Sequence, residues 1–179
     1  PDVLLGGGAD VMEPALSGFN AQFVHTETEL LQWVDDGRPL VGLFAPVTFP
    51  YVRDAVPDMP SLAEMTQAAL DKLSQNPAGF FLMVEGARID HASHANEDEA
   101  VHLETLDFDQ AISTAISWAS TQDDVTMLIT ADHECGGMWF DGGALNQFPT
   151  TYWRWTAHTN ADVNVFATGT AAQVLDGQR

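Results

Sequence analysis

Residues with metal-binding side chains gather in one short stretch of the sequence, between residues 85 and 94. Glu85 directly follows an apolar run at residues 80–84. Asp90 and His94 are four residues apart, so one helical turn places a carboxylate and an imidazole on the same face. Such a pair suits a shared metal ion, and ligands of open α/β sheets collect outside the carboxyl ends of the strands. This stretch is therefore predicted to form part of a metal site.

A second group of candidate ligands follows another apolar run. Asp132 and His133 follow residues 125–130 after a single intervening alanine, and His158 precedes a further predicted strand. Adjacent aspartate and histidine side chains can reach one ion where a strand ends irregularly. The mixture of imidazole and carboxylate favours zinc and leaves Glu85 free to serve a harder ion such as magnesium.

Each of these residues also has an ordinary structural interpretation. A lone histidine or aspartate at a strand end is more often a capping or surface residue than a ligand, but so many at strand ends together favour a site. His25 and His102 have no metal partner in the sequence pattern, and we assign them structural roles. For Cys135, a small buried filler is favoured over a soft ligand or a reactive thiol, and it stays outside the predicted site.

The elements that must position these side chains alternate between apolar runs and helical patterns. This alternation predicts an α/β fold, with part of a mostly parallel central sheet flanked by helices. The expected strands are residues 2–5, 40–45, 79–84, 125–130 and 163–167. The runs at 80–84 and 125–129 are almost continuously apolar, which predicts central strands covered on both faces.

Helix signals lie between these runs. Ser61 and Glu64 form a capping box, which predicts a helix that ends near Asn76 and Pro77. A longer helix is expected over residues 97–119 and a shorter one over 27–35. Residues 136–157 show no clean period and are interpreted as an irregular loop or small insertion. With no internal repeat or linker, residues 1–179 are predicted to form a single domain.

Charge is the strongest compositional signal. The chain has 26 acidic and 6 basic residues and a formal net charge of -20. Such a surface repels nucleic acid and anionic membranes, so neither is expected as a partner. The acidity suggests a salt-adapted (halophilic) source, although carboxylates that bind cations would give a similar composition. A single cysteine excludes an intrachain disulfide.

Six motifs occur together along the chain. They are Leu4-Leu5-Gly6-Gly7-Gly8, residues 62–66, the run 79–86 that ends in Glu85-Gly86, Ile89-Asp90 with His94, residues 130–133, and His158-Thr159. With these motifs the chain resembles the C-terminal portion of a bacterial-type alkaline phosphatase. The motifs occur in the family's order and at similar spacing, and they cover nearly the whole chain.

The resemblance implies a site with two zinc ions and one magnesium ion. Asp90, His94 and His158 match the ligands of one zinc ion, and Asp132 and His133 match ligands of the second. Glu85 matches a magnesium ligand. His91 matches a variable position that in some members approaches the phosphate, often through water.

The family's pattern also requires groups that this chain lacks. In relatives, an Asp-Ser-Ala nucleophile motif, a bridging aspartate, a phosphate-binding arginine and a hydroxyl ligand of magnesium all come earlier in the chain. No serine here stands in an Asp-Ser-Ala context, and Arg88 and Arg154 match no catalytic arginine. No catalytic residue is therefore expected in this chain. Its abrupt start at Pro1 suggests a truncated or cleaved chain.

The resemblance implies the hydrolysis of phosphate monoesters through a phosphoserine intermediate. The expected partners are the monoester substrate, the N-terminal half of the enzyme and a second copy in a homodimer, and the implied location is periplasmic or secreted. Two alternatives stay open: an inactive metal-binding fragment, and a phosphodiesterase or sulfatase-like relative of the same superfamily.

Overall fold

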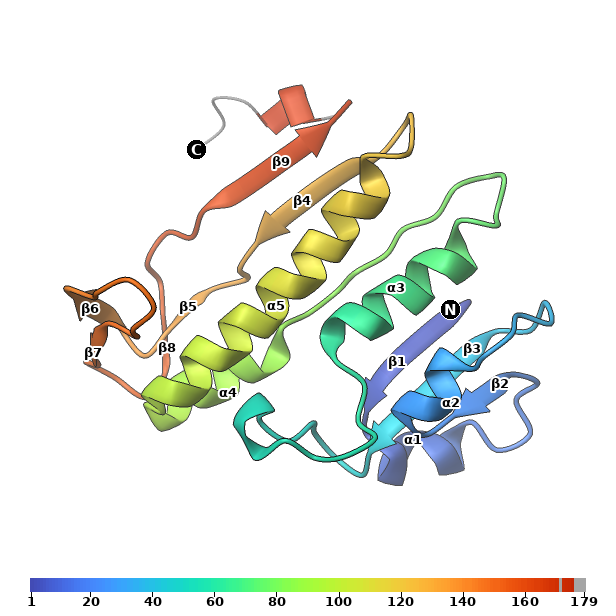
Figure 1. The fold of residues 1–179 in the computed structure, drawn as a ribbon, viewed down its shortest axis with the longest axis horizontal. Helices are drawn as coiled ribbons and strands as arrows, with labels where there is room; N and C mark the ends of the chain where they lie inside the picture. The colour runs from blue at the N-terminus through green and yellow to red at the C-terminus, as the bar shows by residue number, and fades with distance from the viewer. Residues whose placement is uncertain (171, 176–179) are drawn as a thin grey trace.

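One three-stranded sheet, three two-stranded sheets and the helices between them make up the described fold of the computed structural model, which describes residues 1–170 and 172–175 (Figure 1). The first sheet has the order β1-β3-β2, with β1 at Val3–Gly7, β2 at Gln22–Val24 and β3 at Leu40–Ala45. Both of its strand pairs are parallel, and Leu5 lies opposite Gly42. The predicted α/β fold with a parallel sheet is confirmed, as are the strands expected at 2–5 and 40–45.

The strand β3 is buried along its whole length because both of its faces are covered. Leu40 and Phe44 point into a cluster with Met65 of α3 (Leu62–Leu73). Val41 and Leu43 point to the opposite face, where Met12 of α1 (Ala9–Ala15) packs against them. The alternation follows from the two-residue period of a strand. This region contains the best-covered core of the chain.

Three helices agree with the sequence to different degrees. In α3, the Ser61 hydroxyl accepts a hydrogen bond from the Glu64 N–H, and the Glu64 carboxylate accepts one from the Ser61 N–H, so the predicted capping box is confirmed. The helix ends at Leu73, before the predicted Asn76. The helix α5 covers Asp98–Ala119 behind its N-cap Glu97, as predicted, and packs against α3.

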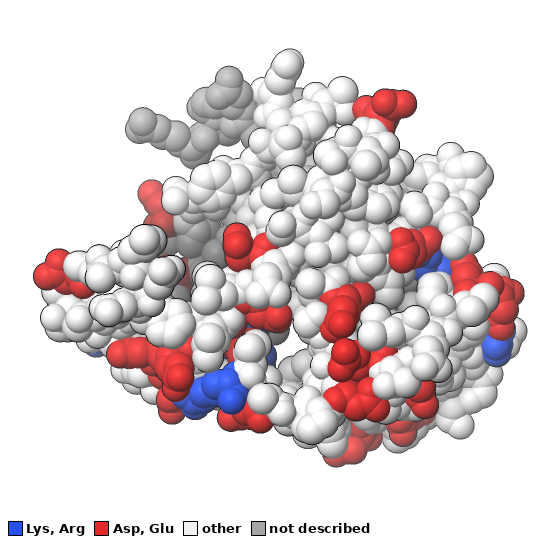
Figure 2. Space-filling view, in the orientation of Figure 1, with Lys and Arg blue, Asp and Glu red and all other residues white. Residues whose placement is uncertain are grey.

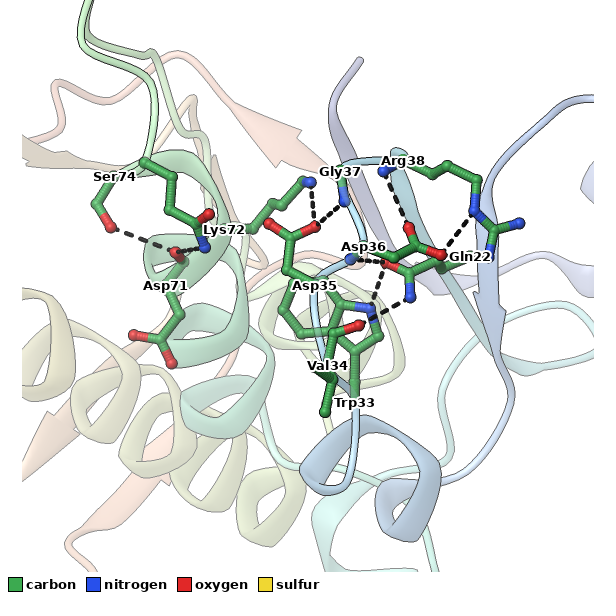
Figure 3. Close-up of polar contacts among 11 residues, drawn as sticks. Gln22, Trp33, Val34, Asp35, Asp36, Gly37, Arg38, Asp71, Lys72 and Ser74 are labelled. Atoms are coloured by element: carbon green, nitrogen blue, oxygen red, sulfur yellow. Dashed lines mark hydrogen bonds and ion pairs between the residues drawn. The ribbon is translucent and has the colours of Figure 1, made fainter.

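The helix α2 (Glu27–Leu31) is shorter than the predicted span 27–35. Its continuation is drawn into a polar cluster instead (Figure 3). The Trp33 indole N–H donates to the Gln22 side chain over 3.0 Å, and the Lys72 ammonium lies 2.6 Å from the Asp35 carboxylate. These long-range bonds fix residues 33–38 in a loop, which a helical periodicity cannot foresee.

The second sheet is an antiparallel pair of β4 (Thr126–Thr130) and β9 (Val165–Gly169). Both strands lie close to their predicted positions. The expectation that residues 125–129 form a central strand covered on both faces is wrong, because Leu128 is 55% exposed and Phe166 of β9 is 61% exposed. Within the described residues, β4 pairs with β9 alone, so its other edge lacks a strand neighbour.

The strand predicted at residues 79–84 does not form in this structure. The segment has no strand assignment, and Phe81 is 88% and Met83 74% exposed. In Figure 1 it runs, in the view, between β1 and β4. A strand requires a hydrogen-bonded neighbour, and none of the described strands pairs with this segment. The prediction of a buried central strand here is therefore wrong for the 179-residue chain.

Residues 136–157, interpreted from the sequence as an irregular loop or small insertion, contain a short antiparallel pair of β6 (Trp139–Asp141) and β7 (Thr150–Tyr152). The rings of Trp139 and Tyr152 stack across this pair with centroids 4.3 Å apart. Two short 3-10 helices lie at Val52–Asp54 and Ala172–Leu175, and α4 (Ala87–Ala95), β5 (Glu134–Cys135) and β8 (His158–Thr159) carry the candidate site described below. Among the helices of the described part of the chain, none has the length and apolar character needed to cross a membrane.

Candidate metal centre

The helix α4 (Ala87–Ala95) carries the first two predicted ligands. It begins after Gly86 and ends at Asn96, whose left-handed backbone (φ 56°) stops the helix. The four-residue spacing places Asp90 and His94 on one face, as predicted, and Asp90 Oδ2 lies 3.4 Å from His94 Nε2. The helix packs on α5, with Ala92 and Ala100 fully buried in a shared cluster, which fixes its position.

His158 reaches the same place from a distant part of the chain. The short strands β5 (Glu134–Cys135) and β8 (His158–Thr159) pair with Cys135 opposite His158. The turn after β5 needs a glycine, because Gly136 has φ 86° and a Cβ there would lie 2.6 Å from the Trp153 ring. His158 Nε2 thereby lies 2.9 Å from His94 Nε2 and 3.3 Å from Asp90 Oδ1.

The three ligand groups fit a zinc ion in their separations. The two Nε2 atoms are 2.9 Å apart, Asp90 Oδ2 lies 3.4 Å from His94 Nε2, and Asp90 Oδ1 lies 3.3 Å from His158 Nε2. A tetrahedral zinc site with bonds of about 2.0 Å has edges of about 3.3 Å. His94 Nδ1 lies 2.7 Å from the Thr156 carbonyl oxygen, a contact in which Nδ1 donates. That bond leaves Nε2 as the lone-pair nitrogen that faces the cluster. Asp90 Oδ1 is buried and accepts no hydrogen bond from the described residues, which also fits a cation.

Cys135 belongs to the same cluster, although it was left outside the site predicted from the sequence. Ligand atoms of Asp90, His94, Cys135 and His158 all lie within 4.8 Å of one another. The signal that could have found it is its place next to Asp132 and His133. Burial raises the pKa of the Cys135 thiol to about 12, and its contact with Asp90 adds to this effect.

The predicted ligands of the second zinc ion lie beside the first cluster. The rings of His133 and His158 stack with centroids 3.5 Å apart, and His133 Nε2 lies 3.2 Å from Asp132 Oδ2. His133 Nδ1 is buried without a hydrogen-bond partner in the described chain. The Asp132 side chain is 83% exposed. The pair can therefore offer two ligands to a neighbouring ion, with open space on the side of Asp132.

Glu85 and His91 lie outside the cluster and line a cavity of about 700 Å³. Its walls come from β1, the loop at residues 47–52, the start of α3, residues 82–86 and the start of α4. An Arg88 guanidinium nitrogen lies 2.7 Å from His91 Nδ1, and the same guanidinium covers the Tyr51 ring at 3.9 Å. Because arginine can only donate, His91 Nδ1 accepts and His91 Nε2 carries the ring proton.

The cavity is more acidic than basic in its lining. Glu64, Glu85, Glu104 and Asp107 face Arg88 and His91 there. Burial raises the pKa of both the Glu104 and Asp107 carboxyls. Figure 2 shows the same excess of carboxylates over the visible face, with few basic side chains. An anionic ligand would be repelled by such a wall unless cations were bound nearby.

The fold and the cluster together define an α/β protein with a candidate zinc centre. Comparison with known proteins gives the family. The alkaline phosphatase family model matches residues 5–152. Alkaline phosphatase 4 of Bacillus subtilis is 38% identical over 143 residues, which covers 76% of this chain and 31% of the relative. The alkaline phosphatase of Gadus morhua is 45% identical over 165 residues, covering 74% of this chain and 34% of the relative.

Solved structures agree with the sequence comparison. The cold-active alkaline phosphatase from a psychrophilic Shewanella superposes with a TM-score of 0.81 at 25% identity, over 95% of this chain and 60% of that chain. The Thermus thermophilus enzyme does so with a TM-score of 0.71 at 30% identity, over 79% of this chain and 32% of that chain. The chain belongs to the alkaline phosphatase family, and it spans about a third of the length of the curated relatives it matches.

Proposed function

We propose that this chain supplies most of the metal ligands of a phosphomonoesterase with two zinc ions and one magnesium ion. Asp90, His94 and His158 would hold one zinc ion, Asp132 and His133 would contribute to the second, and Glu85 would serve magnesium. The observation that carries the proposal is the approach of two imidazole nitrogens and one carboxylate, with separations of 2.9 to 3.4 Å, contributed by α4 and β8.

The chemistry such ions supply is a lowered pKa of a bound oxygen nucleophile and stabilisation of charge on the entering and leaving oxygens. The chain's own residues orient the ligands and the substrate. The Thr156 carbonyl fixes the His94 ring. Arg88 holds His91 so that its Nε2–H can donate to a phosphate oxygen in the cavity. His91 is thus proposed to lie beside the substrate, while the acidic lining makes the cations necessary for anion binding.

The nucleophile is proposed to come from an N-terminal half that lies outside these residues. A serine there would form the phosphoserine intermediate. Three features of the chain support this proposal: the unpaired apolar segment 79–84, the cavity beside it, and the relatives' greater length. The missing half would place strands beside β4 and the 79–84 segment and would fill part of the cavity.

The wider setting of the enzyme is proposed from family membership and from charge. We propose a homodimer in a periplasmic or secreted location, with small phosphate monoesters as substrates. A net charge of -20 further suggests adaptation to salt. If so, the melting temperature of the intact protein rises with NaCl, because salt screens carboxylate repulsion. A flat or falling melting temperature would contradict the salt adaptation alone.

The proposed activity is tested with p-nitrophenyl phosphate in buffer that contains zinc and magnesium. The intact protein, meaning this chain together with the proposed N-terminal half, should hydrolyse the substrate, and the 179-residue chain alone should not. His94→Ala in the intact protein should abolish hydrolysis. His25→Ala is the matched control, because His25 pairs with Glu13 and lies outside the cluster of Asp90, His94, Cys135 and His158. Inactive intact protein would favour the metal-binding fragment, and faster cleavage of a diester or a sulfate would favour the other superfamily activities.

A further inference from the structure

Cys135 occupies a place in the metal cluster that the proposed function does not use. It lies directly opposite His158 in the β5–β8 pair, and its sulfur faces α4, 4.0 Å from the Asp90 carbonyl oxygen. That hydrogen bond is weak, because a thiol is a poor donor. The sulfur lies within 4.8 Å of a carboxylate oxygen of Asp90 and of one imidazole nitrogen each of His94 and His158.

We propose that Cys135 is the fourth protein ligand of the zinc ion held by Asp90, His94 and His158. The inference rests on the proposed metal site and goes beyond it, since it adds a soft ligand to a site otherwise made of oxygen and nitrogen. Zinc accepts thiolate at about 2.3 Å, which places a tetrahedral sulfur about 3.5 Å from each nitrogen. In the structure the sulfur lies at most 4.8 Å from each of the other ligand atoms, so it must move closer to them by about 1.3 Å or less to reach this geometry. β5 is only two residues long and the sulfur turns about one rotatable bond, so a small shift closes the gap.

A sulfur ligand changes which metals the site prefers. Thiolate is a soft ligand, so the site should favour cadmium and zinc over manganese and magnesium more strongly than a site with Asp90, His94 and His158 alone. The fourth position would also be filled by protein in the resting state. Cys135 must then leave the ion when substrate takes that position, as an open coordination position is required for catalysis.

The test uses the intact protein, stripped with a chelator and reloaded with Co²⁺. The expected result is a thiolate-to-cobalt charge-transfer absorption in the near ultraviolet that disappears in Cys135→Ser and in Cys135→Ala. The visible cobalt bands and the cobalt content should remain in both variants. By calorimetry, the affinity for Cd²⁺ should fall by about 10-fold or more in the variants, and the affinity for Mn²⁺ should change far less.

Two failures are distinguishable in this experiment. Cobalt that binds and is lost in His94→Ala, but shows no charge-transfer band in the unsubstituted protein, would overturn the cysteine ligand and leave the proposed metal site intact. Cobalt that does not bind, or whose binding is unaffected by His94→Ala, would overturn the proposed site and the cysteine ligand together. Using both Ser and Ala at position 135 guards against one variant failing to fold, and circular dichroism of each reports its fold.

Discussion

The β1-β3-β2 sheet and the β4-β9 pair differ in how completely they are covered. In the β1-β3-β2 sheet, every residue of β3 is buried, because α1 packs on one face and α3 on the other. In the β4-β9 pair, Leu128 and Phe166 are more than half exposed, and the apolar segment at 79–84 has no strand partner among the described residues. The candidate metal cluster lies on α4, β5 and β8, and β5 follows β4 in the chain.

The difference indicates that the first region contributes most of the stability of this chain and that the second region carries the candidate site. In the first region, the apolar faces of the sheet are buried by helices of this chain. In the second region, the apolar composition of the strands is typical of strands buried on both faces, but the strands are exposed. Exposed apolar patches of this kind mark a surface that meets another part of the protein. We infer that the first region can fold from the residues present, and that the second is completed by the proposed N-terminal half.

The largest expected effect comes from removing a candidate metal ligand next to β4 and β9. Asp90→Asn in the intact protein should lower kcat/KM by more than about 100-fold, since even the outer partners of metal ligands are worth about 10 to 100-fold. Zinc content measured by elemental mass spectrometry should fall in parallel, while the melting temperature of the metal-free protein stays unchanged. Normal zinc content and activity would contradict the assignment of Asp90.

Matched leucine substitutions test whether the β4-β9 pair, but not the first sheet, is buried by the proposed N-terminal half. Leu40→Ala should cost about 2–5 kcal/mol both in the 179-residue chain and in the intact protein, because Leu40 is fully buried. Leu128→Ala should cost less than about 0.5 kcal/mol in the chain alone, as at other surface sites. In the intact protein it should cost about 2 kcal/mol or more. Urea unfolding measures all four values, and equal costs of Leu128→Ala in the two settings would contradict the proposed cover.

The Asp35–Lys72 pair tests whether the first region is self-contained. Its hydrogen bond to Lys72, more than its bond to the Gly37 N–H, lowers the pKa of the Asp35 carboxyl. A lowered pKa stabilises the fold above the unfolded value of about 3.9, and this stabilisation is lost as the pH falls through the folded value. Asp35→Asn should therefore cost about 1–2 kcal/mol at pH 7, with the difference vanishing in acid.

Urea titrations at several pH values measure the Asp35 effect, and Asp71→Asn is the control. Asp71 is exposed and bonds through its side chain to Gln67 on the same helix. The control should change stability by less than about 0.5 kcal/mol at every pH. A cost of Asp35→Asn that persists unchanged in acid would show that the charge on Asp35 is not its source.

The smallest expected effect concerns the start of α3, the helix that covers the first sheet. Ser61→Ala should cost about 1 kcal/mol, because it removes the acceptor of the Glu64 N–H hydrogen bond. Ser74→Ala, at the other end of the helix, should change stability by less than about 0.5 kcal/mol. Thermal unfolding of the two variants compares them directly. An equal effect at both ends would mean that the capping box does not anchor this helix.

Features that depend on residues close together in the sequence could be predicted from the sequence. The capping box at Ser61 and the helix at 98–119 follow from local hydrogen bonding and a 3.6-residue period. The approach of Asp90 to His94 follows from a four-residue spacing within one helix. The place of His158 and the family itself came from a resemblance between motifs, because no local rule links residues 64 positions apart.

What each segment packs against could not be predicted from the sequence, because it depends on the tertiary structure. The apolar run at 79–84 has the composition of a central strand, but pairing depends on a distant neighbour that these residues do not provide. Likewise, α2 stops early because Gln22 and Lys72 bond to the residues that follow it. Cys135 joins the cluster through its register opposite His158, and register is set by long-range pairing, which composition and periodicity do not encode.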